Sequence, residues 1–451
     1  MASILMLSLV FGPDTVSTAN MMTDIAHGLC ACGHKVTVLT TMPHYNPSDA
    51  VRANPVYRSR RLYTRANEGG VDIVRLWMPL KGQAVWRRAL DYVWFHALAL
   101  LLGIIVIRGR QDIVYVPSPP ITLGLAGWLL SLLKGAKFIY DVRELWPDVP
   151  VRLGLLKNKW AIQAVYALEH FVYARTAAIT TIARSFIDNL VRRGVPREKL
   201  FFTPNFVDVD LVSPRSKDNA FAREHGLVDK FVVFYAGNIG LTQGLDVLLV
   251  EVGKLLESQE PRAKNQESRT KNQEPSTQHL GLSTQDLALT TQPAIIVVIG
   301  DGAGRAKLEQ AVRESGVSNI MCLPFQPFSR VPDTYATADV CISPMKFGFS
   351  YDTVPSKIYT AMSAARPVIS ACEDDTESAH LLREAEAGIV VAPESATEMA
   401  EAIMQLRHSP ELARRLGANA RGWVVAHYSK TAVVAEYDRV MRLVSQAARR
   451  G

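Results

Sequence analysis

Cysteine is scarce in this chain, and its cysteines are not spaced as a metal site or a disulfide framework would require. The 451 residues include five cysteines, at positions Cys30, Cys32, Cys322, Cys341 and Cys372. None forms a CxxC pair or a cysteine–histidine spacing of the kind found in zinc sites. An odd, scattered set of thiols is typical of a reducing compartment. We therefore expect reduced thiols, a cytoplasmic location and no bound metal.

Motifs of three other protein classes are also missing. The sequence contains no GxxxxGK[ST] motif, which argues against a P-loop NTPase. The apolar start, Ala2 to Phe11, has neither a basic n-region nor a small-residue cleavage site, so we interpret it as a buried strand. The apolar stretch Tyr92 to Ile107 is shorter than the ~20 residues that a membrane-spanning helix needs.

Length and composition indicate a globular protein with two domains. At 451 residues the chain is too long for one ordinary hydrophobic core, so two domains with a cleft between them are expected. It is 48% hydrophobic and 21% charged, which excludes a disordered chain. The formal net charge of +7 is compatible with an anionic membrane, phosphorylated substrates or nucleic acid, and it does not choose among them.

Short β-branched runs alternate with helical segments along the whole chain, a pattern typical of parallel sheets covered on both faces. In a first domain, residues 1–205, the expected strands are Ser3 to Phe11, Lys35 to Thr41, Asp72 to Trp77, Asp112 to Val116, Lys137 to Asp141 and Ala178 to Ile182. In a second, residues 206–430, they are Phe231 to Ala236, Ala294 to Ile299, Ile320 to Leu323, Val340 to Ser343, Pro367 to Ser370 and Gly388 to Val391. A last helix, Thr431 to Arg449 within residues 431–451, is expected to pack on the first domain.

Two segments depart from this pattern. Ser258 to Gln292 is rich in Gln, Ser and Thr, repeats Lys-Asn-Gln-Glu and lacks aromatic residues, so we expect a disordered insertion in the second domain. Tyr92 to Ile107 is nearly all apolar and is flanked by arginines, which predicts either docking on an anionic membrane or a deeply buried core helix. The flanking arginines are Arg87, Arg88, Arg108 and Arg110.

Glycine and polar residues follow the expected strands, where open α/β sheets bind their ligands. Gly237 to Gly244 follows the first strand of the second domain, and Gly300 to Gly304 follows the next. Glycine there lets backbone amides approach a phosphate, although a tight strand-to-helix turn explains the same residues.

Several motifs together make the chain resemble a known enzyme family. Their order resembles that of family 4 retaining glycosyltransferases, which have the GT-B fold of two facing Rossmann-like domains with a C-terminal helix returning to the first. The general motifs are Gly33 to Val38, Ala236 to Gly240, Gly300 to Gly302 and Ala361 to Ile369. Two further motifs, Asp141 to Pro147 and Val354 to Lys357, resemble the branch of bacterial N-acetylfucosamine transferases of O-antigen and capsule assembly.

The resemblance implies a metal-independent enzyme without a cofactor that takes a nucleotide-sugar donor on its second domain. By position, the donor-binding residues would be Gly237, Asn238, Gly240, Gly300, Asp301, Gly302, Phe325, Gln326, Pro355, Ser356 and Lys357. On the acceptor side, the first domain would contribute Gly12, Asp14, Asp141, Glu144 and Asp148.

The chain departs from the family pattern at the positions that carry charge. Asn238 and Gln243 stand where many members have Arg and Lys, and Asp352 and Thr360 stand near the usual pair of Glu residues. The catalytic groups we expect are therefore Lys357, with the helix start at Pro355 and Ser356, together with Arg143 and Asp352. No histidine has a partner visible in the sequence, so His27, His34 and His44 are interpreted as structural.

The function predicted from the sequence is transfer of an N-acetylated hexosamine or deoxyhexosamine, with retention, from a UDP-sugar to a lipid-linked glycan acceptor. The enzyme would be peripheral on the inner face of the plasma membrane, with no nucleic-acid partner. Two alternatives remain open: a non-hydrolysing UDP-sugar epimerase of the same fold, and a catalytically degenerate member that binds glycans or acts as a scaffold.

Overall fold

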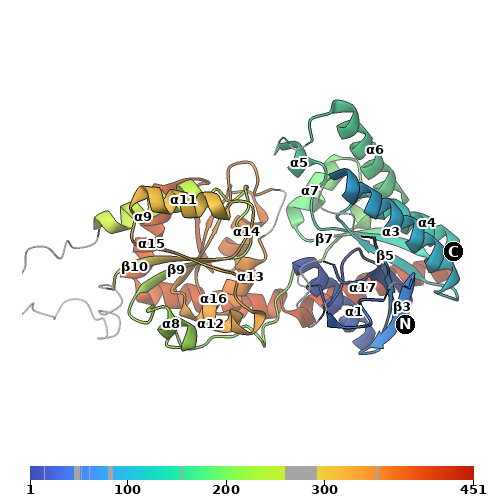
Figure 1. The fold of residues 1–451 in the computed structure, drawn as a ribbon, viewed down its shortest axis with the longest axis horizontal. Helices are drawn as coiled ribbons and strands as arrows, with labels where there is room; N and C mark the ends of the chain where they lie inside the picture. Colours follow the sequence, from blue (N-terminus) through green and yellow to red (C-terminus); the bar gives the residue numbers. More distant parts are fainter. Residues whose placement is uncertain are drawn as a thin grey trace, which may run out of the picture. The chain divides into compact units, whose positions relative to one another are not determined.

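The computed structural model describes residues 1–14, 16–44, 51, 53–59, 61–79, 85–152, 154, 156–259, 292–351 and 355–450. These residues divide into two compact units. The first unit comprises Met1–Phe206 and Lys430–Gly451, and the second comprises Val207–Ser429. Both chain termini lie in the first unit (Figure 1). Each unit is an α/β domain built on one sheet.

The first unit contains an eight-stranded sheet in the order β3-β4-β2-β1-β5-β6-β7-β8. All neighbours are parallel except β3, which pairs antiparallel with β4. Its strands are β1 (Ser3–Leu7), β2 (Lys35–Thr41), β3 (Tyr63–Glu68), β4 (Val71–Leu76), β5 (Ile113–Pro117), β6 (Lys137–Val142), β7 (Ala178–Thr181) and β8 (Leu200–Phe202). Its helices are α1 (Ser17–Ala31), α3 (Val85–Ile105), α4 (Thr122–Lys134), α5 (Asp148–Arg152), α6 (Lys159–Arg175), α7 (Arg184–Arg192), the short 3-10 helix η1 (Arg197–Lys199) and α17 (Lys430–Arg450).

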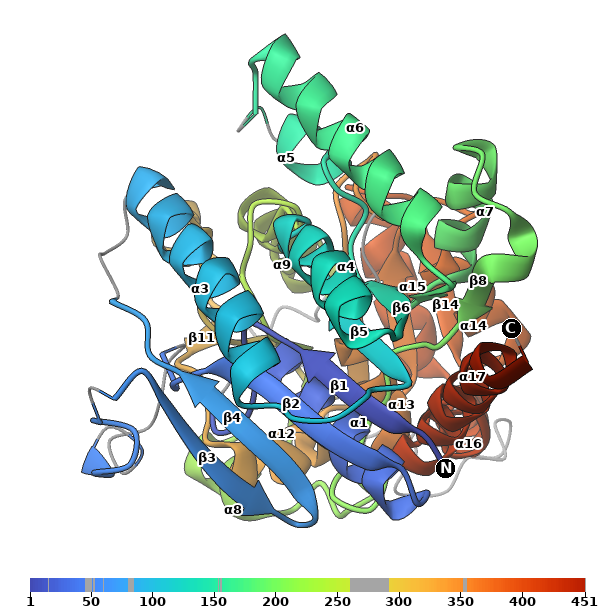
Figure 2. The same cartoon turned by 90° about the vertical axis from the view of Figure 1, so that its right-hand side faces the viewer.

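Helices cover both faces of this sheet, as expected for parallel strands. The helices α3 and α4 pack against each other and lie side by side over one face (Figure 2). On the other face α1 and α17 share one core with β1, β2 and β5; from α17 the buried residues include Val433, Tyr437 and Met441. The expected return of the last helix to the first domain is therefore confirmed.

The second unit contains a six-stranded parallel sheet in the order β11-β10-β9-β12-β13-β14. Its strands are β9 (Phe231–Ala236), β10 (Ala294–Ile299), β11 (Ile320–Leu323), β12 (Val340–Pro344), β13 (Val368–Ala371) and β14 (Gly388–Val391). Its helices are α8 (Ala220–Glu224), α9 (Leu245–Gln259), α11 (Arg305–Ser315), the 3-10 helix η2 (Phe328–Arg330), α12 (Val331–Thr337), α13 (Lys357–Ser363), α14 (Glu377–Glu384), α15 (Ala396–His408) and α16 (Pro410–His427). In Figure 1, α9 and α11 lie over one face of the sheet, and α12 and α16 lie over the other.

The order of the strands in this sheet reverses direction at β9. The chain builds outward through β10 and β11, then returns to the other side of β9 for β12, β13 and β14. Ligands of open parallel sheets bind at such a switch point, beyond the carboxyl ends of the central strands. The loops that follow β9, β10, β12 and β13 are therefore the place to look for a site in this unit.

Two strands of the first unit were not predicted. In β3 nearly every residue is exposed, so the strand lacks the apolar alternation that marks a strand in sequence. The strand β8 has three residues. Of the predicted disordered insertion, Ser258 and Gln259 instead belong to the end of α9, and residues 260–291 lie outside the described part of the chain.

Candidate active site

The loops after β9 and β10 lie against each other at the carboxyl edge of the second sheet. The Gly237 N–H donates to the Ile299 carbonyl at 2.9 Å, and the Gly304 N–H donates to the Ile239 carbonyl at 2.8 Å. The φ angles of Gly237, Gly300 and Gly302 are +132°, +153° and +146°. Only glycine adopts such angles without strain.

Close backbone contact explains why glycine is needed here. A Cβ at Gly300 would lie 1.9 Å from the Gly237 carbonyl oxygen, and a Cβ at Gly302 would lie 2.6 Å from the Ile239 carbonyl oxygen. The glycines are thus required for the two loops to pack, which is the tight-turn explanation of this motif. Their contact with a phosphate stays a prediction.

Two uncharged residues hold the first of these loops in place. The carbonyl of Asn238 accepts a hydrogen bond from the Tyr235 hydroxyl at 2.6 Å. The side-chain oxygen of Gln243 accepts from the Gly240 N–H at 2.8 Å. Gln243 therefore supports the loop but supplies no charge to it, and a cation for this site must come from another element.

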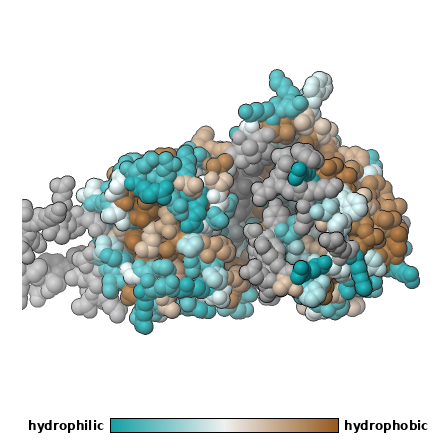
Figure 3. All heavy atoms as spheres, in the orientation of Figure 1, coloured by the Kyte–Doolittle hydropathy of each residue, from teal (hydrophilic) through white to brown (hydrophobic). Residues whose placement is uncertain are grey.

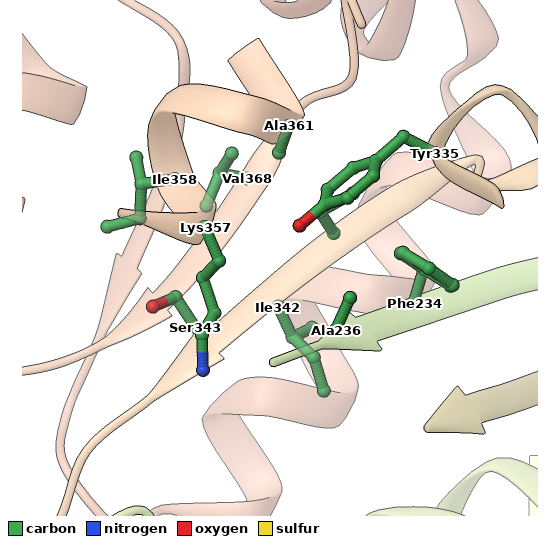
Figure 4. Close-up of a pocket in the computed structure, with 10 residues that line it drawn as sticks. Phe234, Ala236, Tyr335, Ile342, Ser343, Lys357, Ile358, Ala361 and Val368 are labelled. Carbon is green, nitrogen blue, oxygen red and sulfur yellow. The ribbon is translucent and has the colours of Figure 1, made fainter. Parts of the chain in front are cut away.

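Lys357 is such a cation (Figure 4). It is the first residue of α13, and its side chain runs past Ser343 toward the loop that contains Gly237. The ammonium nitrogen lies 3.8 Å from the centroid of the Tyr235 ring. A Cβ at Gly237 would lie 3.4 Å from the Lys357 Cε atom. The space lined by Lys357, Phe234 and Ile342 is about 10 Å³, room for no more than one water.

The surroundings of Lys357 disfavour its charge. Burial lowers the pKa of Lys357 to about 7. In the part of the chain that the structure describes, no carboxylate forms an ion pair with it. An anion placed beside the amine would stabilise the ammonium form and raise this pKa again. Lys357 is thus a buried amine beside Gly237 without an ion-pair partner among the described residues, and its contact with a donor phosphate stays a prediction.

The start of α13 differs slightly from the prediction. The helix begins at Lys357, and Ser356 occupies the capping position without a side-chain capping bond. The expected start at Pro355 is thus two residues early. Asp352, the remaining predicted catalytic residue of this segment, lies outside the described residues. Thr360, the second departure from the family pattern, donates its hydroxyl to the Ser356 carbonyl at 3.4 Å.

The remaining predicted donor residues lie on the loops after β10 and β11. The Asp301 carboxylate accepts from the Gly302 N–H at 2.8 Å. Phe325 is 70% exposed, and the Gln326 amide donates to the Pro324 carbonyl at 3.0 Å. Since β10 and β11 are neighbours in the sheet, these side chains share its carboxyl edge with the glycine loops.

Sequence reasoning missed one carboxylate at this edge. Glu373 follows β13, and one of its oxygens accepts a hydrogen bond from the Gly348 N–H in the loop after β12. Its other oxygen, Oε2, is buried without a hydrogen-bond partner among the described residues. Its position just after a strand is the signal in the sequence that points to it.

In the first unit, Arg143 and Asp141 form the centre of a buried polar network. Asp141 is fully buried and accepts hydrogen bonds from the Tyr115 hydroxyl at 2.7 Å, from the Thr180 hydroxyl at 2.8 Å and from Arg143 at 3.1 Å. Arg143 is 8% exposed and also donates to the Asn205 side chain at 2.5 Å.

This burial changes the interpretation of both residues. The carboxylate of Asp141 is occupied by donors of the protein itself, so the structure makes it a support for Arg143 rather than a group open to a sugar. The pairing with Asp141 raises the pKa of Arg143, although burial alone would lower it. Because its charge is balanced within the unit, a catalytic role for Arg143 stays a prediction with less support than that of Lys357.

The predicted acceptor residues Gly12 and Asp14 lie in a second polar cluster, after β1. The Asp14 carboxylate accepts from the His44 N–H at 2.8 Å. The Gly12 carbonyl accepts from Arg75, a buried arginine of β4 whose pKa is lowered mainly by burial. Neither His44 nor Arg75 was expected at this site.

The other two predicted acceptor residues follow β6. Burial raises the pKa of Glu144, whose carboxylate accepts from the Trp146 indole at 3.2 Å. The Asp148 carboxylate pairs with Arg193 at 2.5 Å and accepts from the Tyr166 hydroxyl at 2.6 Å. An open recess of about 410 Å³ is lined by Asp148, Tyr166 and Arg193. Their contact with an acceptor stays a prediction.

Among the described residues, no group of three or more His, Cys, Asp or Glu side chains is arranged to hold a metal ion.

Two family models match the chain. The model of the glycosyl transferase 4-like domain matches residues 18–205, and that of the glycosyl transferases group 1 matches residues 268–423. A curated relative is the putative colanic acid biosynthesis glycosyl transferase WcaI of Escherichia coli K12, 23% identical over 89% of this chain and 91% of that protein.

Solved structures show the same fold. The sucrose-phosphate synthase of Thermosynechococcus elongatus has a TM-score of 0.70 and 16% identity, over 99% of this chain and 100% of that one. Anabaena HepE, crystallised in complex with UDP and glucose, has a TM-score of 0.68 and 12% identity, over 98% and 100% of the two chains.

Proposed function

We propose that this chain, a GT-B glycosyltransferase, adds a sugar from a UDP-sugar to a bacterial surface polysaccharide. The premise is that it has a glycosyl transferase 4-like domain and a glycosyl transferases group 1 domain. One observation carries the proposal: the glycine loops of the second unit pack together beside Lys357, the cation whose amine lacks an anionic partner among the described residues. Two of the similar proteins support the proposal. HepE is crystallised with UDP, which supports a UDP-sugar as the donor, and WcaI is described as a putative colanic acid biosynthesis glycosyl transferase, which supports a polysaccharide as the product.

The chemistry follows from the charge that develops when the donor reacts. The bond between the anomeric carbon and the phosphate oxygen breaks, and the acceptor hydroxyl oxygen forms a new bond to the same face of that carbon. The acceptor's proton passes to the leaving phosphate oxygen, so no protein nucleophile or base is required. Lys357 and the amides of the glycine loops would stabilise the departing diphosphate, an effect that grows as the bond breaks. We propose that no metal or cofactor takes part.

The donor sugar follows from the resemblance rather than from the site. The motif Asp141 to Pro147 is similar to that of N-acetylfucosamine transferases, so we propose an N-acetylated hexosamine or deoxyhexosamine. Of this motif, Asp141 and Arg143 are buried in the first unit. These two residues of the motif therefore stabilise the first unit, and we propose that other residues contact the sugar.

A transfer assay tests the proposal. Purified protein is incubated with a panel of radiolabelled UDP-sugars and with lipid-linked glycans from bacterial membranes, and the anomeric configuration of the product is read by NMR. We expect transfer of one N-acetylated sugar with retention. Conversion of the UDP-sugar to its epimer without an acceptor would indicate an epimerase, and binding without turnover would indicate a degenerate member.

An apolar surface of the first unit supports a location at the membrane. We call the exposed apolar side chains of α3 and α4 the apolar face; they include Val93 at 64% exposure and Leu132 at 60%. Hydrophobic residues, coloured brown, gather on this part of the first unit in Figure 3. Apolar residues on one exposed helix pair are unusual for a surface that contacts only water. Among the described residues no helix is long and apolar enough to cross a bilayer. We propose that this face lies in the headgroup region of the inner membrane leaflet.

Basic residues border the apolar face. Arg87 is exposed near the start of α3, and Arg108 and Arg110 are exposed just beyond its end. The ammonium of Lys134 bonds to the Ile104 and Ile107 carbonyls at the end of α3. Each arginine near anionic headgroups would contribute about 1 kcal/mol to binding.

A sedimentation assay tests the docking. Wild-type protein should pellet with vesicles that contain anionic lipid, and less so in high salt. The variant with Arg87, Arg108 and Arg110 changed to Glu should stay in the supernatant. A control with three arginines of the second unit changed to Glu, Arg223, Arg313 and Arg415, has the same net charge and should still pellet. If wild-type protein ignores anionic vesicles, the docking proposal is wrong.

A further inference from the structure

Lys346 follows β12 and lies against the end of the loop that follows β9. Its N–H donates to the Thr242 carbonyl at 2.8 Å. The preceding residue, Met345, accepts a hydrogen bond at its sulfur atom from the Gln243 side-chain amide at 3.8 Å. Since β9 and β12 are neighbours in the parallel sheet, these two contacts hold Lys346 at the carboxyl edge, beside the glycine loops.

The side chain of Lys346 runs across Gly244, the last residue before α9. A Cβ at Gly244 would lie 3.1 Å from the Lys346 Cγ atom and 3.0 Å from its Cε atom. Gly244 has a φ of +62°, an angle that glycine adopts without strain. The missing side chain at position 244 thus leaves room for the stem of Lys346. The ammonium, bonded to Cε, therefore lies at the end of this loop.

The charge of Lys346 is not taken up by an ion pair among the described residues. The carboxylate that feels this charge is Asp246, in the first turn of α9. Burial alone would raise the pKa of Asp246, but its hydrogen bond with Lys307 and, to a smaller extent, the charge of Lys346 lower it. The ion pair of Asp246 is with Lys307, at 2.7 Å. The positive charge of Lys346 is therefore left over at this edge of the sheet.

Two lysines thus lie at the two ends of one loop. Lys357 lies beside Gly237, where the loop begins, and Lys346 lies on Gly244, where it ends. They come from different elements, since Lys357 starts α13 and Lys346 follows β12. Like charges near one another are stabilised by an anion that contacts both. A diphosphate spreads its charge over two phosphate groups, and ammonium groups form strong hydrogen bonds with phosphate oxygens.

We propose that Lys346 is the second cation of the donor site and binds the diphosphate of the nucleotide sugar together with Lys357. It supplies from the loop after β12 the charge that Gln243 lacks. Gln243 directly precedes Gly244, and it stands where many members of the family have a lysine. The proposal rests on the function proposed above, because it requires a nucleotide diphosphate at the glycine loops. It adds the residue that replaces the missing lysine.

Titrations of the full-length protein with UDP and with uridine test this role, because only UDP carries phosphate groups. Both affinities are measured by NMR, which also detects weak binding. Lys346→Met keeps the stem that packs on Gly244 and removes the charge, whereas Lys346→Arg keeps a charge. Lys254→Met is the matched control: it removes a lysine of α9 that pairs with Glu251 at 2.9 Å. Lys357→Met is titrated in parallel.

We expect Lys346→Met to weaken UDP binding by about tenfold or more and to leave uridine binding unchanged. Lys346→Arg should lose much less, and Lys254→Met should bind UDP as the wild type does. The ratio of the two affinities does not change if part of a variant is unfolded, so it separates a lost phosphate contact from a lost fold.

Three results would overturn the role of Lys346 alone while Lys357→Met still weakens UDP binding. They are wild-type affinity for UDP in Lys346→Met, an equal loss of UDP and uridine binding in that variant, and a loss in Lys346→Arg or Lys254→Met as large as in Lys346→Met. A wild type that does not bind UDP, or UDP binding that survives both Lys346→Met and Lys357→Met, would overturn the proposed donor site as well.

Discussion

Replacing Lys357 by methionine should uncouple UDP binding from the uptake of a proton. Burial lowers the pKa of Lys357 to about 7, so at pH 8 roughly nine-tenths of the molecules carry a neutral amine. A diphosphate beside this amine stabilises the ammonium and raises its pKa. Binding of UDP at pH 8 should therefore take up about 0.9 proton per molecule. The methionine variant should take up none, since its side chain cannot be protonated.

Calorimetry in two buffers measures this uptake. The observed enthalpy of UDP binding is compared in Tris and in HEPES, whose ionisation enthalpies differ, and the difference gives the number of protons bound. Lys307→Met is the matched control, because Lys307 is exposed and its charge is paired with Asp246 at 2.7 Å. It should keep the uptake of the wild type. Equal enthalpies in both buffers for the wild type would refute the placement of Lys357 beside the diphosphate.

The same lysine should reduce the stability of the ligand-free protein. Its pKa is about 7 when folded, against a reference value of 10.5, so between these pH values the unfolded chain binds more protons. Stability should then rise with pH across this window. At pH 7 the lowered pKa of Lys357 reduces the free energy of unfolding by at most ~4 kcal/mol, and by on the order of 2 kcal/mol once the partial exposure of the side chain is allowed for. Lys357→Met should thus resist urea better while transferring sugar more slowly. A variant with lower stability and wild-type turnover would contradict this reasoning.

Three further predictions concern the glycine loops, the insertion and metals. Gly300→Ala should destabilise the second unit by more than ~2 kcal/mol in urea unfolding, because the new Cβ would clash with the Gly237 carbonyl. Gly422→Ala, on the open side of α16, should change stability by less than ~1 kcal/mol. Similar losses of stability for both variants would show that the close contact at Gly300 is not the cause. Deletion of Ser258 to Gln292 should leave soluble protein and transfer intact, since the segment has too little apolar content to form a core, and loss of either would contradict this. Transfer should survive EDTA, and activity abolished by EDTA and restored by magnesium or manganese would show a metal requirement.

The strands were predictable because their signal is local. The runs Phe231–Ala236 and Ala294–Ile299 are apolar and rich in β-branched residues, and the structure has strands with these bounds. The exposed strand β3 lacks such a run, and its place is fixed by pairing with β4. Sequence reasoning thus recovered the longer buried strands and missed the two edge strands of the first sheet, the exposed β3 and the three-residue β8.

Residues of the site were predictable only where their role depends on their own loop rather than on partners far away in the sequence. Gly237 and Gly300 could be placed after strands, and their role in close packing follows from glycine itself. Asp141 was predicted to meet a sugar, but two of its three donors, Tyr115 of β5 and Thr180 of β7, come from other strands, so its burial could not be read from neighbours in sequence. His34 has its partner, Asp438, at 2.6 Å and 404 positions away.

The position of α17 imposes an order on synthesis. The first unit needs Val433, Tyr437 and Met441 to complete its core, yet the ribosome makes residues 207–429 before them. The second unit can therefore finish folding during translation, while the first waits with one face of α1 uncovered until α17 emerges from the ribosome. A chain that stops before α17 would have an intact second unit and a first unit whose core lacks the side chains of that helix. Such a product would display apolar surface to chaperones and proteases.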